Sequence, residues 1–93
     1  MLSLTRRVYD HINCYYKGAK LNIYIKAITT HGIIANFNEY KDEFLTQDDY
    51  FEYCLAGETI QIHLNQLHPK DCVLGIIADK EVKIIRGELK HFQ

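Results

Sequence analysis

An aromatic ring and a cation are adjacent at Tyr40 and Lys41, and a second such set, His68 and Lys70, lies further along the chain. A tyrosine ring offers a flat face on which a nucleobase can stack, and a lysine ammonium group attracts a phosphate. These residue types therefore favour contact with a single nucleic-acid strand. The alternative is that Tyr40 is an ordinary loop aromatic and Lys41 a solvated charge.

Metal binding and catalysis find little support in the sequence. The chain has five histidines and three cysteines, but none has the spacing of a zinc or metalloprotease motif. No nucleophile elbow, phosphate loop or dinucleotide fingerprint is present. A nucleophilic pair of Cys72 and His68 is the remaining catalytic alternative. We therefore expect a protein that is not an enzyme, with no metal and no cofactor.

Length and composition predict one domain over residues 1–93. The chain is 47% hydrophobic and 25% charged, which excludes a disordered protein. It contains no apolar run near the ~18 residues of a membrane span, so we expect no membrane association. The N-terminus has no apolar signal segment, which favours a cytoplasmic protein, or one of the host cytoplasm if the source is viral.

Charge is distributed unevenly, although the net charge is only −1. Residues 1–30 carry a net charge of +4, residues 31–63 one of −6, and residues 64–93 one of +1. A basic patch built from the N-terminal segment would suit an anionic partner, whereas the acidic middle would repel it. A solvated surface of mixed charge is the alternative.

An N-terminal helix is predicted over residues 4–17. Apolar side chains recur there every four residues, at Leu4, Val8, Ile12 and Tyr16. Gly18 follows, at the position where a helix commonly ends. Arg6 and Arg7 fall outside the apolar stripe, so they would either grip phosphates from the exposed helix face or simply keep the helix soluble.

Beyond Gly18 the apolar period changes from four to two, which is typical of strands. Strands are predicted over residues 21–26, Ile33–Phe37, Tyr50–Leu55, Thr59–Leu64, Val73–Ala78 and Val82–Ile85. A short sheet with two bare edges is prone to aggregate, and bending the strands into a closed barrel removes the edges. We therefore predict a mainly β fold, with a five-stranded, strongly bent antiparallel barrel over residues 20–78 and a C-terminal strand or tail over residues 79–93.

The stretch from Leu21 to Leu45 resembles the first motif of the Sm/LSm family, which includes bacterial Hfq. Gly32 stands at the motif's glycine, where a bent strand tolerates no side chain. Phe37 and Asn38 stand for its aromatic-Asp pair, and Leu45 for its closing apolar residue. The family keeps a helix before this motif, in agreement with the predicted helix.

This resemblance implies an Sm-like barrel that assembles into a homo-oligomeric ring of about five to seven subunits and binds single-stranded RNA. Asn38, Tyr40 and Lys41 would contact the RNA, and His68 and Lys70 would lie beside them. Such a protein would act as an RNA chaperone or in RNA processing. The chain departs from the family where Asp42 replaces an asparagine that reads the edge of uracil, because a carboxylate only accepts hydrogen bonds.

A second resemblance leads to an alternative function. Ile12-Asn13-Cys14, Ala56-Gly57-Glu58-Thr59 and His63-Leu64 are similar to pieces of Rho-binding antiterminators, which also use an Sm-like barrel but bind a protein. The alternative is therefore a protein–protein interaction module, antiterminator-like or an assembly factor, that does not bind RNA. The acidic segment around Asp42 agrees with this second role.

Overall fold

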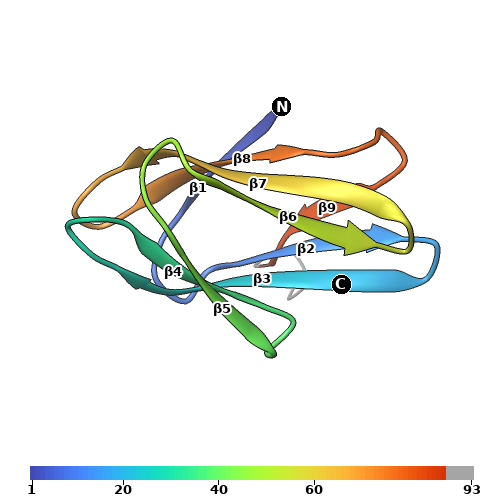
Figure 1. Ribbon diagram of the computed structural model, residues 1–93, viewed down its shortest axis with the longest axis horizontal. Coiled ribbons are helices and arrows are strands. Elements are labelled where there is room, and N and C mark those ends of the chain that lie inside the picture. The colour runs from blue at the N-terminus through green and yellow to red at the C-terminus, as the bar shows by residue number, and fades with distance from the viewer. Residues whose placement is uncertain (88–93) are drawn as a thin grey trace.

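The computed structural model of this protein describes residues 1–87, and all the secondary-structure elements within them are β-strands. Figure 1 shows that the strands form two layers. The nine strands are β1 (Leu2–Arg6), β2 (His11–Tyr16), β3 (Ala19–Ile28), β4 (Ile33–Phe37), β5 (Lys41–Leu45), β6 (Tyr50–Leu55), β7 (Glu58–Leu67), β8 (Cys72–Ile77) and β9 (Lys83–Arg86).

The two layers are antiparallel sheets with the strand orders β1-β8-β7-β6 and β5-β4-β3-β2-β9. Strands β2 to β5 follow one another through the five-stranded sheet, and β6 to β8 do the same in the four-stranded sheet. The first and the last strand each join the sheet that the other end of the chain forms: β1 pairs with β8, whereas β9 pairs with β2. The long strands β3 and β7 each carry a register shift, at Ile25/Ala27 and Leu64/Gln66, which is the geometry of a β-bulge.

The core lies between the sheets and follows from the alternation of apolar side chains. Every second residue of the central strands is buried, namely Leu21, Ile23 and Ile25 in β3 and Ile60, Ile62 and Leu64 in β7. Phe37 of β4 stacks on Phe51 of β6, with ring centroids 4.5 Å apart, and so joins the two sheets. None of the described residues forms a helix that is long and apolar enough to cross a membrane.

The prediction of a helix over residues 4–17 is wrong, because this segment forms β1, a turn and β2. A spacing of four places side chains on one face of a strand as well as of a helix, so it does not distinguish the two. The segment also turns sharply at Tyr9, whose φ is 75°, and Asp10 closes the turn by accepting a hydrogen bond from the Arg7 backbone at 2.8 Å.

The prediction of a closed five-stranded barrel is also wrong. Because the N-terminal segment supplies β1 and β2, there are enough strands for two sheets that cover each other's apolar face. Among the described strands, β1 and β6 are the edges of one sheet, and β5 and β9 are the edges of the other. The mainly β character is confirmed, and so are the strands Ile33–Phe37 and Tyr50–Leu55, with the bounds predicted for them. The predicted C-terminal strand corresponds to β9, and residues 88–93 lie outside the described part of the chain.

Candidate functional site

The outer face of the five-stranded sheet carries a continuous group of polar side chains. Because the apolar residues of β2, β3 and β4 turn inward, their alternating neighbours turn outward. The register then places His11 opposite Tyr24 and Asn13 opposite Asn22, and Asn36 follows opposite Tyr24 on the other side. We call His11, Asn13 and Asn22 the amide network.

Hydrogen bonds fix the amide network from within. The Asn22 Nδ2 donates to Asn13 Oδ1 at 2.8 Å and also lies 3.0 Å from His11 Nδ1. Asn13 is only 2% exposed, and its Oδ1 is the acceptor of the first of these bonds. The network therefore forms an ordered polar floor, and no buried side-chain nitrogen or oxygen of the described residues lacks a hydrogen-bond partner.

Asn38 shapes the turn that borders the network. Its φ of 54° lies in the left-handed region, which asparagine tolerates better than most residues. Its Oδ1 accepts from the Asn22 backbone at 2.7 Å, and its Nδ2 donates to the Lys20 carbonyl and to the Tyr53 hydroxyl, both at 3.1 Å. Asn38 therefore holds the β4–β5 turn in place, and the residues that follow it are positioned by these bonds.

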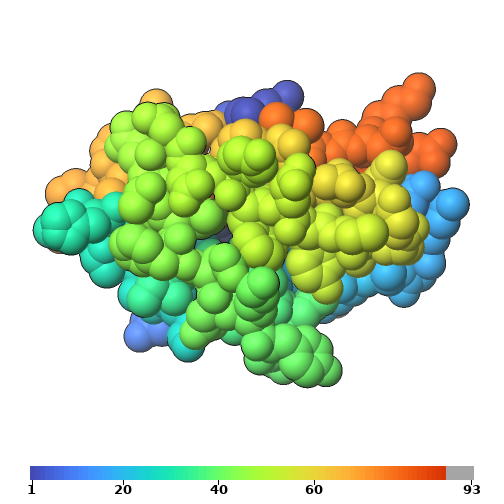
Figure 2. Space-filling view, in the orientation of Figure 1, coloured from blue at the N-terminus to red at the C-terminus, as the bar shows by residue number. Residues whose placement is uncertain are grey.

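A cleft of about 610 Å³ opens above the amide network. Lys20, Glu39 and Tyr40 also line it, and Tyr40 is 94% exposed, so its ring stands at the rim. Figure 2 shows the segment around the β4–β5 turn projecting from the lower edge of the molecule. A second cavity of about 280 Å³ shares His11, Asn22 and Glu39 with the cleft and continues along the sheet.

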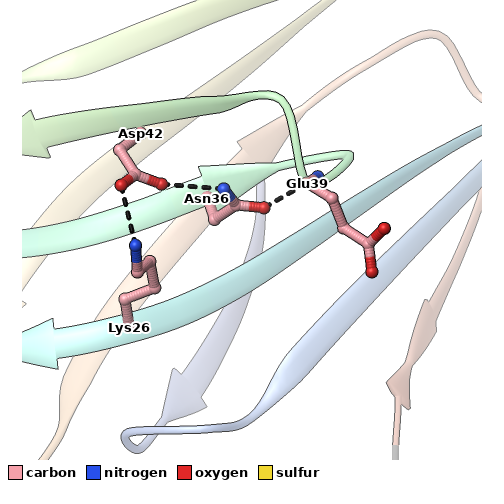
Figure 3. A network of polar contacts seen from close by, with 4 residues as sticks. All are labelled: Lys26, Asn36, Glu39 and Asp42. Carbon is pink, nitrogen blue, oxygen red and sulfur yellow. Dashed lines mark hydrogen bonds and ion pairs between the residues drawn. The ribbon is translucent and has the colours of Figure 1, made fainter.

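Charged groups beside the second cavity are arranged as an ordered chain of contacts (Figure 3). Asp42 accepts from Asn36 Nδ2 at 2.7 Å and from Lys26 Nζ at 2.8 Å, and these hydrogen bonds lower the pKa of the Asp42 carboxyl below its ordinary value. The Asn36 Oδ1 in turn accepts from the Glu39 backbone at 2.8 Å. The Glu39 carboxylate itself points away from Asn36 and Asp42.

Aromatic rings extend the polar surface on the β2 side. The Tyr24 ring lies 4.6 Å from the His11 ring and 6.1 Å from the Tyr9 ring, measured between centroids. Lys20 Nζ lies 5.8 Å from the centre of the Tyr15 ring. Flat π-faces and ammonium groups are therefore neighbours on this face.

The structure brings some of the predicted site residues together and separates others. Asn38 and Tyr40 both line the cleft. Lys41 leaves it, because its Nζ lies 5.3 Å from the Phe51 ring centre and 3.4 Å from the Glu43 carboxylate.

The resemblance implies that His68 and Lys70 lie beside Tyr40, but the structure places them elsewhere. His68 lines a different cavity, of about 440 Å³, together with Thr29 and Thr30. The turn with these threonines precedes β4, and the turn with Tyr40 follows it, so five strand residues, or about 15 Å, separate the two. Lys70 is exposed in the same β7–β8 loop as His68.

The two arginines occupy positions different from those predicted. Arg6 ends β1, is buried, and donates to the Thr5 carbonyl at 2.6 Å and the His11 carbonyl at 3.3 Å, so it holds the backbone beside the amide network. Arg7 is exposed in the turn between β1 and β2. Because the predicted helix does not exist, neither arginine stands on an exposed helix face.

The sequence interpretation missed the residues at the centre of the cleft. His11 and Asn13 fall within the predicted helix, and Asn22 falls within the strand predicted over residues 21–26. Glu39 falls within the acidic block of residues 31–63. The available signal was the strict alternation of polar and apolar residues from His11 to Cys14, which predicts a strand with two polar side chains on one face.

The described residues contain neither a metal-binding cluster nor a disulfide bond. No group of three or more histidine, cysteine, aspartate or glutamate side chains gathers at metal-binding distance within residues 1–87. The three cysteines are free, with Cys14 and Cys72 buried and Cys54 exposed. Burial raises the pKa of the Cys14 thiol to about 12 and that of Cys72 to about 11.

These thiols are expected to differ sharply in reactivity. Because the thiolate is the reactive form, Cys14 and Cys72 should resist a thiol reagent near neutral pH, whereas Cys54 should react at once. We expect one rapidly labelled thiol per folded chain and three in urea, as measured by absorbance with a chromogenic disulfide reagent. The Cys54→Ser variant should remove the rapid phase, and a rapid phase that survives in it would contradict the assignment.

Comparison with known proteins gave no match to any family model, curated protein or solved structure.

Proposed function

We propose that the cleft on the outer face of the five-stranded sheet binds single-stranded RNA. The observation that carries the proposal is the Tyr40 ring, fully exposed at the rim of a cleft whose floor consists of the amide network. Single-stranded RNA is recognised by stacking its splayed bases on aromatic rings and by hydrogen bonds to the base edges. The resemblance of residues 21–45 to the Sm motif supports the same class of ligand.

The groups along the two adjoining cavities match the parts of a nucleotide strand. Amide side chains both donate and accept hydrogen bonds, as base edges do. Lys20 lines the cleft, and its ammonium group supplies positive charge for phosphates, whereas Lys26 in the second cavity is ion-paired with Asp42. The outward face of β3 is long enough for about two or three stacked bases, which is the number that other open sheet faces bind.

Removal of the Tyr40 ring is expected to weaken RNA binding by about 5- to 150-fold, because a base stacked on an aromatic side chain contributes about 1–3 kcal/mol. The measurement is a fluorescence-anisotropy titration of a labelled single strand with Tyr40→Ala. Tyr50→Ala is the matched control, since Tyr50 is half exposed on the four-stranded sheet, where it stacks on His63. Equal affinities for the two variants would rule out the cleft as the binding site.

Assembly into a homo-oligomeric ring of about five to seven subunits is part of the same proposal, because a ring would repeat each weak cleft and strengthen binding through multivalency. Within residues 1–87 each sheet ends in two edge strands, through which copies would pair. Light scattering on a gel-filtration column gives the native mass. A monomer would exclude the ring and leave only the single cleft.

A protein-interaction module is the second candidate, favoured by the charge around the edge strands β5 and β6. Residues 39–58 contain seven acidic side chains and one lysine, and an RNA strand would avoid this side of the molecule. Affinity purification that recovers one defined protein, combined with no affinity for any RNA pool, would support this candidate. Binding of RNA that weakens steeply with added salt would support the first.

A further inference from the structure

Glu39 occupies the junction between the cleft and the second cavity, and lines both. Its φ of 65° is left-handed, and its backbone N–H donates to Asn36 Oδ1 at 2.8 Å. The backbone at this position is therefore held by the tight β4–β5 turn, and the side chain is carried over the polar face. In Figure 3 its carboxylate extends from the turn, away from the contacts between Asn36, Lys26 and Asp42.

The Glu39 carboxylate forms no ion pair and accepts no hydrogen bond among the residues that the structure describes. The neighbouring Asp42 shows the contrast, because it is occupied by both Lys26 and Asn36. An ionised carboxylate only accepts hydrogen bonds, and it repels phosphate. The ligand atom that suits Glu39 is consequently an uncharged donor rather than a phosphate oxygen.

The floor of the same cleft supplies the complementary group. The side chains of His11, Asn13 and Asn22 line the cleft together with Glu39. The cleft thus sets the Glu39 carboxylate, an acceptor, beside side chains that carry amide donors, and a hydroxyl group can both donate and accept.

We infer that Glu39 selects RNA over DNA by accepting a hydrogen bond from the ribose 2′-hydroxyl of a strand lying in the cleft. The inference rests on the proposed function and adds to it the chemical group that is recognised. The 2′-hydroxyl is the feature that distinguishes the two nucleic acids at a single nucleotide. A base stacked near Tyr40 brings its own sugar toward the turn that carries both Tyr40 and Glu39.

The experiment compares three labelled single strands of identical sequence, about nine nucleotides long and built only from adenine and cytosine so that the bases do not differ. One is RNA, one is DNA, and one is 2′-fluoro RNA, which keeps the ribose-like sugar shape but has no 2′-hydroxyl donor. Affinities are measured by fluorescence anisotropy for the wild type and three variants. The variants are Glu39→Ala, Glu39→Gln and the control Glu81→Ala, which removes an exposed carboxylate before β9.

We expect the wild type to bind RNA about tenfold more tightly than either DNA or 2′-fluoro RNA, as for a hydrogen bond to a charged group. Glu39→Ala should bring this ratio to within about twofold of one, while DNA affinity stays the same or rises because a repulsive charge is gone. Glu39→Gln keeps a neutral acceptor and should restore part of the ratio. Glu81→Ala should keep the full ratio.

Each other outcome overturns a defined part of the argument. Equal wild-type affinity for RNA and 2′-fluoro RNA would overturn the inference while leaving RNA binding intact. A ratio that persists in Glu39→Ala would overturn the role of Glu39. Failure of all three strands to bind would overturn the proposed function together with the inference. Circular dichroism of the variants shows whether a lost ratio comes from a lost fold.

Discussion

Replacement of Gly32 by alanine is expected to lower the free energy of unfolding by about 2–3 kcal/mol, because the added Cβ would overlap the backbone carbonyl of Leu45. It would also approach Cζ of Phe44 to 3.0 Å. The Leu45 carbonyl belongs to the ladder between β4 and β5 and cannot move without disturbing it. In a domain of this size the midpoint of thermal unfolding should fall by about 10–20 °C.

Gly75→Ala is the matched control for this prediction. A Cβ at Gly75 would also meet close neighbours, but the nearest are the side chains of Met1 and Asn65 rather than backbone. Met1 is exposed, so its flexible end can rotate away at little cost. Thermal unfolding followed by circular dichroism compares the two variants. If Gly32→Ala were no less stable than Gly75→Ala, the close approach at Gly32 would not matter to the fold.

The sequence predicts that position 32 tolerates no side chain, and the structure gives a different reason for this constraint. The Sm-like motif implied a bent strand that tolerates no side chain, and the structure places Gly32 against the neighbouring strand at the point where β4 begins. The requirement for a missing side chain is thus independent of whether the sheet closes into a barrel. A local motif can therefore identify a constrained residue even where it gives the wrong architecture.

The N-terminal segment shows why the architecture was less accessible. Leu4 and Ile12 lie in different strands and in different sheets, yet they fit one helical stripe by spacing alone. In Ile33–Phe37 and Tyr50–Leu55 the apolar period of two fits a strand but not a helix, so these strands were predictable. Ambiguous spacing is decided by tertiary pairing, here of β1 with β8 and of β2 with β3, which no local pattern encodes.

Some residues of the candidate site were also predictable from the sequence, and others were not. Tyr40 was predictable, because an aromatic residue in a polar turn is exposed wherever the turn lies. The amide network was not, since it depends on the register that sets Asn13 opposite Asn22. Asn38 was predicted as an RNA contact, and its side-chain atoms are instead occupied by Asn22, Lys20 and Tyr53. Sequence indicates which residue types are available, whereas pairing decides which of them remain free.

Replacement of Phe37 by alanine is expected to have the largest effect on stability, a loss of about 3–5 kcal/mol. Phe37 is 1% exposed, and its ring stacks on Phe51 of the other sheet, so its removal leaves a cavity at the point where the two sheets meet. A chain of this length has a total stability of about 5–14 kcal/mol, so this loss is a large part of it. Urea denaturation followed by circular dichroism gives the free energy directly.

Phe44→Ala is the control for Phe37→Ala, because Phe44 is 51% exposed on the adjacent edge strand β5 and should cost about 1 kcal/mol or less. Similar losses for the two variants would contradict the role of Phe37 in joining the sheets. Phe37 also precedes Asn38 directly, and its carbonyl accepts the Tyr40 backbone N–H at 3.2 Å. The core contact that joins the sheets therefore also anchors the turn that carries Tyr40, so the stability of the core and the geometry of the cleft depend on the same residue.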